Sequence, residues 1–374
     1  MKKLSGIAPD SGTLMTLAVI LMVSASACGC ISSSDTADGT GTTSTIIDMA
    51  GRTVEIPQSI DGFVAIEAGA LRYAVYAGGA DRIVGVEDVE FSDSVIAPVR
   101  PYNFAHPEFS LLPSIGPIHG GDSELIASLE PDVIFWTYAT AEDADALFAQ
   151  TGIPVVCIVY GDLLGGWDTF CQALRIYGNV LGTDDIVEQK IGYIQSLKDD
   201  LDRRSCTILE EDMPSAYVGG VACRGPHSIE STNPVYEPFE LLGADNVAAE
   251  LGTTTRSIDP EILLTWDPDY IFVDESSYAV GVFDDLNSGL YSDMSAIVDK
   301  NVYGVMPYNW YTANWSTVLA DAYYIGKVLY PEEFDDIEID TLADEIYTNL
   351  VGAPVYGDMC GYYEGLTCLA HHME

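Results

Sequence analysis

Basic side chains are scarce in this sequence. Its 374 residues include 15 lysines and arginines against 58 aspartates and glutamates, which gives a formal net charge of -43. Binding to nucleic-acid phosphates requires lysine and arginine on the surface, so the composition excludes a duplex nucleic-acid partner. The same deficit argues against a peripheral helix held by anionic lipid. The acids are dispersed along the chain, which is typical of a solvated surface.

The motifs of several enzyme classes are also missing. There is no G-x-S-x-G elbow, no Walker phosphate loop, no G-x-G-x-x-G turn and no H-E-x-x-H metal motif. These absences disfavour an enzyme and leave a surface hydrolase as a distant alternative. No C-x-x-C pair occurs either, which argues against a zinc cluster held by cysteines.

No apolar run is long enough to span a bilayer comfortably. The chain instead starts with two lysines, an apolar stretch from Leu14 to Val23 and small residues before Cys28, which is typical of a secretory signal. We therefore expect a signal peptide over residues 1–27 and a lipid on Cys28, with Cys30 as the competing anchor and a simple signal as the alternative. The Ser-, Thr-, Gly- and Asp-rich segment that follows predicts a flexible tether over residues 28–45.

Eight cysteines occur in the chain, and six of them follow Cys30. An exported protein can oxidise these six, but they allow fifteen pairings, so the connectivity stays open. Cys360 and Cys368 flank a short loop and are the best candidates for a disulfide. Cys157 lies in an apolar strand pattern, which indicates a buried free thiol.

Short apolar strands and helices alternate after the tether. This alternation predicts parallel sheets with helices on both faces, and a small hairpin is expected at residues 45–56. The expected strands cover residues 63–66, 83–86, 133–136, 155–159, 216–219, 270–273 and 302–305. The expected helices cover residues 70–77, 124–129, 141–150, 238–242, 260–264, 316–329 and 342–350.

A repeat divides this alternation into two units. Residues 124–135 (ELIASLEPDVIF) resemble residues 261–272 (EILLTWDPDYIF), and each copy consists of a helix, an acidic residue, Pro-Asp and a buried strand. A second match pairs Gly-Ala-Asp at 79–81 with the same residues at 243–245. The two copies imply two lobes of similar α/β design. The first lobe has an additional loop around residues 102–121.

A helical stretch, Trp167–Arg204, separates the two copies and breaks near Gly182. Apolar residues of its second part lie on one face, and Thr183 is the expected N-cap of that part. About 22 residues at 1.5 Å each span roughly 33 Å, which is enough to cross from one lobe to the other. The expected units are an N-terminal lobe over residues 46–165, an interlobe helix region over 166–206 and a C-terminal lobe over 207–374.

Together these features resemble the substrate-binding proteins of ABC importers, in the helical-backbone class that serves ferric siderophores, haem and cobalamin. The segment DMAGRTV at residues 48–54, the segment DRIVGV at 81–86 and both Pro-Asp strands carry the resemblance. Residues 224–232 and 307–311 resemble a subset of iron-type binding proteins common in archaea and anaerobes. The resemblance implies an α/β fold of two Rossmann-like lobes joined by one long rigid helix, with the ligand cleft between them. It also implies a lipoprotein anchored to the outer face of the cell membrane.

The resemblance further implies the partners. In this family a glutamate on each lobe docks onto arginines of the membrane permease, and the matching positions are Glu124 and Glu261. A separate subunit would hydrolyse ATP, so no cofactor, resident metal or catalytic residue is expected here, and the protein is expected to be a monomer. The implied ligand is a ferric siderophore-like iron chelate. Cobalamin, haem and a bare divalent metal such as zinc or manganese are the alternatives.

The loops that follow the strands are the candidates for the ligand site, because open α/β sheets bind ligands beyond the carboxyl ends of their strands. Arg72 and Arg224 lie on such loops and favour a ligand with carboxylate, phosphate or other oxyanion groups, unless each is paired with an acid that braces its loop. The loops concerned are residues 67–72, 137–138, 160–162, 223–227, 274–275 and 306–311.

Aromatic residues gather in the last of these loops. Three of its four residues from 308 to 311 are aromatic, which predicts a stacking wall for a flat chelate or macrocycle unless the rings pack between the lobes. A bare zinc or manganese site would instead require His106, His227 and Asp274 to converge, and the sequence does not show that they do. The predicted ligand-binding residues are Arg72, Tyr102, Asn103, Tyr138, Arg224, His227, Tyr308, Asn309, Trp310 and Tyr311.

Asn314 stands just before the last but one expected helix. The sequence Asn-Trp-Ser at this point fits a glycosylation sequon. A helix start also favours asparagine as N-cap. We prefer the cap.

Overall fold

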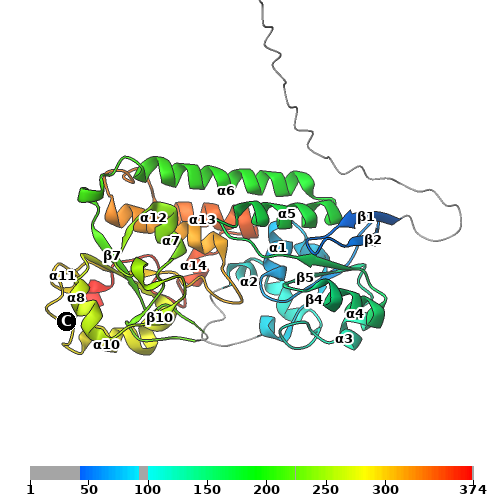
Figure 1. The fold of residues 1–374 in the computed structure, drawn as a ribbon, viewed down its shortest axis with the longest axis horizontal. Coiled ribbons are helices and arrows are strands. Elements are labelled where there is room, and N and C mark those ends of the chain that lie inside the picture. The colour runs from blue at the N-terminus through cyan, green and yellow to red at the C-terminus, as the bar shows by residue number, and fades with distance from the viewer. Residues whose placement is uncertain (1–42, 92–99, 224, 373–374) are drawn as a thin grey trace, which may run out of the picture.

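The protein consists of two α/β lobes that lie side by side, with a layer of helices along one edge of both (Figure 1). The structure is a computed structural model and describes residues 43–91, 100–223 and 225–372. Within these ranges no helix combines the length and the apolar character needed to cross a membrane. The expected signal peptide, most of the expected tether, Cys28, Cys30 and Arg224 lie outside the described residues.

The N-terminal lobe is built on a parallel sheet of strand order β4-β3-β5-β6. An antiparallel hairpin precedes this sheet and begins at Thr43, inside the segment expected to be tether. The strands are β1 (Thr43–Ile47), β2 (Thr53–Pro57), β3 (Phe63–Ile66), β4 (Ile83–Gly85), β5 (Val133–Thr137) and β6 (Val155–Ile158). The helices are α1 (Ala70–Tyr76), α2 (Pro101–Ala105), α3 (Ser123–Ser128) and α4 (Ala141–Thr151). The additional loop of the first lobe contains α2 and no strand.

The C-terminal lobe repeats this design with a parallel sheet of order β12-β11-β7-β9. Its strands are β7 (Ser215–Gly219), β9 (Asp245–Asn246), β11 (Tyr270–Asp274) and β12 (Val302–Val305), and a separate antiparallel pair is formed by β8 (Ser231–Thr232) and β10 (Arg256–Ser257). Its helices are α7 (Glu237–Leu242), α8 (Pro260–Trp266), α9 (Glu275–Ser277), the π-helix η7 (Tyr278–Val282), α10 (Phe283–Asn287) and α11 (Ser295–Val298). The prediction of two α/β lobes with parallel sheets is therefore confirmed.

The Pro-Asp repeat has the same structural role in both lobes. The carboxylate of Asp132 accepts hydrogen bonds from the backbone amides of Asp61 (2.7 Å) and Gly62 (3.0 Å), just before β3. The carboxylate of Asp269 accepts one from the amide of Ser215 (2.9 Å), where β7 begins. Each aspartate thus ties the start of one central strand to the start of its neighbour.

The acidic residue before each Pro-Asp pair also has an equivalent conformation. Glu130 has φ 48° and Asp267 has φ 43°. Left-handed backbone of this kind ends a helix and redirects the chain. In both lobes it turns the chain from α3 or α8 into the following strand. The repeat therefore comprises a helix, this turn and a strand.

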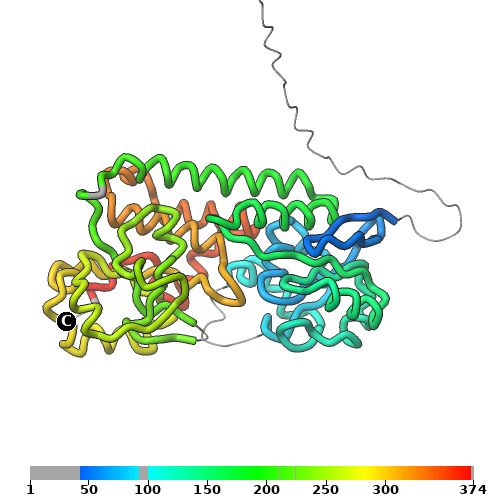
Figure 2. Tube along the Cα trace, viewed as in Figure 1, coloured from blue at the N-terminus to red at the C-terminus, as the bar shows by residue number. Residues whose placement is uncertain are grey.

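The edge layer consists of α5 (Trp167–Leu181), α6 (Asp184–Ser205), α12 (Trp315–Leu329), α13 (Ile339–Val351) and α14 (Tyr356–Met359). Figure 2 shows α6 running along both lobes, as expected for the connecting helix. Its predicted apolar face is buried and comprises Val187, Ile191, Ile194, Leu197 and Leu201. Thr183 occupies the predicted N-cap position of α6, but its side chain makes no capping bond, and its amide donates to the carbonyl oxygen of Gly178 at the end of α5 (2.8 Å).

The C-terminal helix α13 adds a second connection between the lobes. The Nζ atom of Lys190 on α6 donates to the carbonyl oxygen of Leu350 (3.0 Å), and Nε2 of His106 in the N-terminal lobe lies 2.9 Å from the carbonyl oxygen of Val351. This helix also contacts α1 and α2. Two helices, rather than α6 alone, therefore limit how far the lobes can separate.

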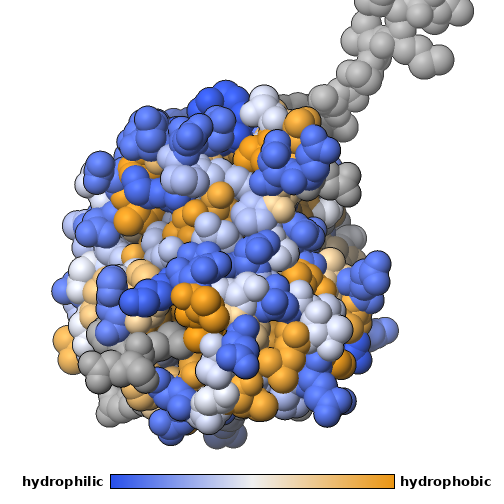
Figure 3. Space-filling model, turned by 90° about the vertical axis from the view of Figure 1, so that its left-hand side faces the viewer, coloured by the Kyte–Doolittle hydropathy of each residue, from blue (hydrophilic) through white to orange (hydrophobic). Residues whose placement is uncertain are grey.

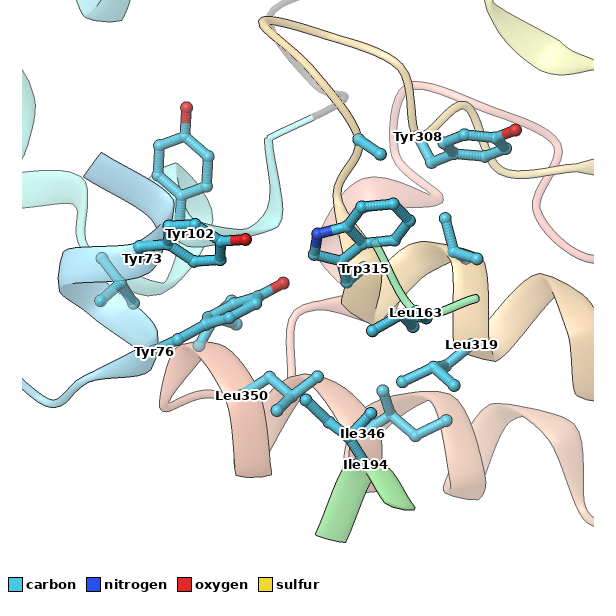
Figure 4. Close-up of a cluster of buried hydrophobic side chains, with 14 of the residues drawn as sticks. Tyr73, Tyr76, Tyr102, Leu163, Ile194, Tyr308, Trp315, Leu319, Ile346 and Leu350 are labelled. Atoms are coloured by element: carbon cyan, nitrogen blue, oxygen red, sulfur yellow. The ribbon is translucent and has the colours of Figure 1, made fainter. Parts of the chain in front are cut away.

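One hydrophobic core extends across both lobes and the edge layer. In Figure 4, Tyr73, Tyr76 and Tyr102 of the N-terminal lobe face Trp315, while Ile194, Leu319, Ile346 and Leu350 from the edge helices lie beneath them. Two smaller clusters cover the outer faces of the two sheets. Because the inner faces share one core, the lobes are packed against each other and not merely linked.

The six cysteines of the described residues are all free thiols. The expected Cys360–Cys368 disulfide is therefore absent: the Cys368 sulfur lies 3.8 Å from the carbonyl oxygen of Lys300, whereas Cys360 packs beside Gly365. Cys157 is buried, as predicted.

Candidate functional site

One loop of the C-terminal lobe reaches across to the N-terminal lobe. This interlobe loop, Pro307–Asn314, connects β12 to α12 and is pinched by a β-bridge between Asn309 and Ala313. At its tip, Tyr311 (φ 49°) and Thr312 (φ 67°) adopt the left-handed conformation that side chains other than glycine rarely take. The loop contains the whole aromatic run at residues 308–311.

Arg72 on α1 holds the interlobe loop from the other lobe. Its side chain is 1% exposed. Its guanidinium donates to Asn314 Oδ1 (2.9 Å), to the carbonyl oxygens of Trp310 (3.1 Å) and Thr312 (3.2 Å), and to Tyr160 Oη (2.5 Å). Within the described residues no carboxylate forms an ion pair with it. Arg72 therefore braces the two lobes through neutral acceptors, and nearly all of its donors are used.

Asn314 takes part in this brace and does not cap α12. Its side-chain oxygen accepts from Arg72, and its Nδ2 donates to the carbonyl oxygen of Tyr308 (2.9 Å). It occupies the N-cap position, but no side-chain capping bond is formed. The predicted N-cap position is therefore confirmed, but the asparagine side chain forms the contact between lobes and no capping bond.

A hydrogen-bonded latch closes the tip of the interlobe loop. The Tyr311 hydroxyl donates to Glu87 Oε2 (3.0 Å) and accepts from the backbone amide of His119 (3.1 Å). His119 Nδ1 lies 2.6 Å from Glu67 Oε1, and the amide of Glu67 donates to the same Glu87 oxygen (3.0 Å). The C-terminal lobe thus inserts one tyrosine among three residues of the N-terminal lobe.

Unusual backbone is concentrated at this junction. Of eight non-glycine residues with positive φ in the described chain, five lie here: Glu67, His119, Tyr138, Tyr311 and Thr312. Such conformations cost about 1–3 kcal/mol each and are retained where the surroundings impose them, which is most often at functional sites. The distribution makes the junction between the lobes the candidate functional region.

The latch makes stability depend on pH. Burial raises the pKa of Glu87 to about 7 from its ordinary value of 4.5, so between these values the folded state holds more protons than the unfolded state. We expect the free energy of unfolding to fall by up to about 3 kcal/mol as the pH rises from 4.5 to 7. Urea titrations of the native protein and of Glu87→Gln at pH 5 and pH 7.5 will measure this.

The glutamine variant is expected to lose that part of the pH dependence while keeping a hydrogen bond to Tyr311. Glu275, whose pKa burial raises to about 9, continues the decline at higher pH in both proteins and serves as an internal reference. An equal slope in the two proteins between pH 5 and 7 would contradict the role given to Glu87.

A second buried network lies behind Arg72. Glu90 accepts hydrogen bonds from Arg100 Nη1 (2.7 Å), Tyr102 Oη (3.1 Å) and Asn103 Nδ2 (3.1 Å). The ring of Tyr102 lies 5.6 Å from the Arg72 guanidinium carbon. Arg72 and Tyr102 border this filled interior, so their polar groups serve contacts within the protein.

An open cavity of about 330 Å³ lies beside the interlobe loop, which forms part of its wall. Its walls contain aromatic rings from both lobes, and Tyr160 and Trp315 are stacked with ring centroids 6.1 Å apart. Asp162 comes from the N-terminal lobe and Glu237 from the C-terminal lobe. The remaining lining residues are Gly161, Val221, Asn233, Val235, Thr253, Thr255, Asp274, Tyr308, Asn309, Thr312 and Ala313.

A family model described as "Periplasmic binding protein" matches residues 73–308, which include most of both sheets, the connecting helix and most of the cavity walls. The chain belongs to the periplasmic binding protein family. It is 25% identical over 338 residues to the molybdate-binding protein MolA of Haemophilus influenzae, a match that covers 81% of this chain and 89% of MolA.

Solved structures of periplasmic binding proteins show the same fold. A periplasmic solute binding protein from Veillonella parvula superimposes with a TM-score of 0.69 at 18% identity, covering 86% of this chain and 96% of the other. The structure of Haemophilus influenzae MolA gives a TM-score of 0.64 at 21% identity, covering 83% and 98%. Each of these relatives is described as a binding protein.

In this periplasmic binding protein the predicted ligand residues are distributed over several environments. Tyr308 and Asn309 line the cavity. Arg72, Tyr102 and Tyr311 border the filled interior, and Asn103 bonds to Glu90. Tyr138 is 56% exposed near Tyr160, Trp310 contributes its carbonyl to Arg72, and the exposed His227 lies 2.8 Å from the carbonyl oxygen of Cys223.

Several cavity residues were missed by the sequence analysis. Trp315 and Glu237 lie at helix starts, Asn233 directly follows the two-residue strand β8, and Thr253 and Thr255 lie just before β10. The loop at 160–162 and Asp274 were among the predicted loops and do line the cavity. The sequence indicated Glu237 only through its position: it directly precedes Pro238 at the start of an expected helix.

The described residues contain no group of three or more histidine, cysteine, aspartate or glutamate side chains arranged to hold a metal ion. His106 bonds to Val351, His227 to Cys223, and the Asp274 carboxylate to Ser276, so these three side chains do not converge.

Glu124 and Glu261 occupy equivalent places in the two lobes. Each lies exposed in the first turn of its helix, α3 or α8. Neither carboxylate has a hydrogen bond or ion pair with another described residue. Both carboxylates are thus free to meet a partner.

Figure 3 shows the end of the molecule formed by the C-terminal lobe, where hydrophobic side chains are interspersed among hydrophilic ones.

Proposed function

We propose that this chain is the solute-binding component of an ABC importer and that it captures a metal chelate, with a siderophore-type iron chelate first, in the cavity between its lobes. The cavity carries this proposal. Its volume of about 330 Å³ suits an organic complex, because small-molecule sites are typically clefts of about 300–1,000 Å³.

The aromatic walls support a chelate over a bare ion. Tyr160, Tyr308 and Trp315 present ring surfaces that can pack against the organic ligand of a chelate. Free metal ions instead require several converging imidazole, thiolate or carboxylate groups. Cobalamin and haem are chelates of the same general kind and enter the same test.

Molybdate is the second candidate because it is the ligand named for MolA. A small oxyanion would need hydrogen-bond donors, which arginine, lysine or free backbone amides supply best. The described lining residues of the cavity include no arginine or lysine, and the donors of Arg72 face the interlobe loop. The geometry therefore favours the chelate.

The location follows from the family together with the sequence. A periplasmic binding protein acts outside the cytoplasm, and we propose that the chain is held at the outer face of the cell membrane by a lipid on Cys28 or Cys30. Mass spectrometry of the protein extracted from its own membrane would show a diacylglyceryl-type mass increase on the N-terminal peptide. A mature N-terminus without lipid would refute the anchor.

Native mass spectrometry of the purified protein tests the ligand class. The panel is a ferric trihydroxamate, cyanocobalamin, haemin, molybdate and free zinc or manganese ions. We expect one-to-one complexes with a chelate and none with molybdate or a bare ion. Binding of molybdate or a bare ion alone would overturn the chelate proposal.

Asn309 provides a variant that tests the place of binding. It is exposed on the cavity wall, and its own side-chain bond to the carbonyl oxygen of Ala222 is long, at 3.5 Å. A ligand hydrogen bond contributes about 1–1.5 kcal/mol, so Asn309→Ala should weaken chelate binding about tenfold with little change in stability. Tryptophan fluorescence titration with the chelate found in the panel will measure this.

Asn287→Ala is the matched control, because Asn287 is exposed on α10 and its amide bonds only to the carbonyl oxygen of Phe283. Its affinity should equal that of the native protein. If Asn309→Ala binds as tightly as this control, the ligand does not contact that wall of the cavity.

A further inference from the structure

Two carboxylates face the cavity from opposite lobes. Asp162 follows β6 in the N-terminal lobe, and its Oδ1 accepts hydrogen bonds from the amides of Leu164 (2.8 Å) and Gly166 (2.8 Å). These bonds hold the side chain in a tight turn. They fix its place in the wall but leave its other oxygen without a bond to any described residue.

Glu237 faces the cavity from the first residue of α7. Its Oε2 accepts a hydrogen bond from the Tyr308 hydroxyl, so the glutamate is held against the aromatic wall. Burial is the main cause of its raised pKa, and the nearby charge of Asp162 raises the pKa further. The two acids therefore lie close enough to interact across the gap between lobes.

The other charges around the cavity leave it negative. Asp274 is a third acid in the lining. The nearest basic groups stand outside the described lining: Arg72 lies behind Tyr160, and Lys198 rests on the ring of Trp167 at 4.1 Å, within electrostatic range of Asp162. The wall thus offers carboxylate oxygens and aromatic faces to a ligand.

We propose that the cavity selects ligands with net positive charge and that Asp162 and Glu237 hold the cationic part between the lobes. This rests on the proposed function, since it assumes that the cavity is the ligand site. An opposite charge a few ångströms from a partly buried carboxylate gains considerably more than it would in water, and aromatic faces attract cations as well. A negative ligand such as an oxyanion meets repulsion from the same groups.

A cationic ligand would also favour closure of the cavity. Without it, the charge of Asp162 acts unfavourably on the ionised Glu237 carboxylate across the gap between the lobes. A positive group between them converts this repulsion into attraction for both lobes. The same electrostatic contact therefore selects a positively charged ligand and holds the two lobes together.

A series of ferric chelates that differ only in charge tests the inference. Ferrioxamine B has a free ammonium group and carries one positive charge, its N-acetyl derivative is neutral and its N-succinyl derivative carries one negative charge. We expect affinity to fall about tenfold for each step from positive to negative. Equal affinities, or tighter binding of the succinyl form, would overturn the charge inference while leaving the chelate function intact.

If none of the three hydroxamates binds, the result counts against an iron chelate as the ligand and not against charge selection. Charge selection is then measured by comparing the binding of cationic aquocobalamin and neutral cyanocobalamin. Tighter binding of the aquo form supports charge selection, and equal binding overturns it. Preference for molybdate over every chelate, or no binding at all, would overturn both proposals.

Two conservative variants assign the effect to the two acids. Glu237→Gln and Asp162→Asn keep the acceptor oxygens for Tyr308 and for the turn, and remove only the charge. Each should weaken binding of ferrioxamine B about tenfold and change binding of the neutral acetyl form less than about twofold. An equal loss for both chelates would show a merely structural role. Glu240→Gln, an exposed glutamate on the same helix α7, is the control and should leave both affinities unchanged.

Discussion

Replacing Arg72 with alanine is expected to lower the free energy of unfolding by about 3–5 kcal/mol. The substitution leaves four buried or partly buried acceptors without their donor: Asn314 Oδ1, Tyr160 Oη and the carbonyl oxygens of Trp310 and Thr312. Hydrogen bonds to a charged group contribute about 1.5–3 kcal/mol each, and the loss is not additive because the loop can shift and admit water.

The loss should appear as a change in how the lobes are held together as well as in overall stability. Arg72 joins α1 to the segment that also carries Tyr311 and Thr312, whose left-handed backbone is costly without support. We expect hydrogen exchange to accelerate selectively in residues 307–314 of the variant. Urea unfolding, followed by tryptophan fluorescence, gives the free energy.

Two further variants make this result specific. Arg72→Lys retains the charge but has a single nitrogen, so it should recover only part of the stability. Arg175→Ala removes an arginine from an exposed pair with Glu188 and should cost less than about 1 kcal/mol. A loss below 1 kcal/mol for Arg72→Ala would show that the brace contributes little to holding the lobes.

The fold was predictable because its signals are local. Strand and helix periods and the Pro-Asp pairs recur in both lobes within short stretches of sequence, and the left-handed residues Glu130 and Asp267 end α3 and α8 locally. The side-chain capping bonds expected at Thr183 and Asn314 are not formed, and at Asn314 a tertiary contact with Arg72 occupies the side chain. Helix-cap propensity depends only on neighbouring residues, so it cannot predict a hydrogen bond between Asn314 and Arg72, which lies 242 residues away in the sequence.

The site was less predictable for the same reason. The rule that ligands bind beyond strand ends led to the loop at 160–162 and to Tyr308 and Asn309, which line the cavity. It could not show that Arg72 and Tyr311 are consumed by contacts between lobes, nor that Glu237 and Trp315 would enter the wall from two helices. Which side of a loop faces a cavity depends on how two separately folded units pack.

Reversing the charge of Glu124 and Glu261 together is expected to abolish delivery of the ligand. We propose that these two carboxylates dock onto basic pockets of a permease, and the structure leaves both exposed without a partner among the described residues. Removing one partner of an interface charge pair costs about 2–5 kcal/mol, so Glu124→Lys with Glu261→Lys should weaken docking by about a thousandfold or more. Sedimentation with permease-containing membranes measures docking, and cellular accumulation of labelled ligand measures delivery.

Because the two docking sites are equivalent, the single and double reversals have different expected effects on docking, which a general effect of net charge would not produce. Each single reversal should leave one lobe able to dock and therefore cause a partial loss, whereas the double reversal removes both anchors. The control pair is Glu142→Lys with Glu240→Lys, which changes the net charge equally at exposed first-turn glutamates of α4 and α7. Ligand affinity should stay within about twofold in all variants, because none of these residues lines the cavity. Equal docking by the two double variants would show that attraction depends on total charge, and that the repeated helix starts are not specific contacts.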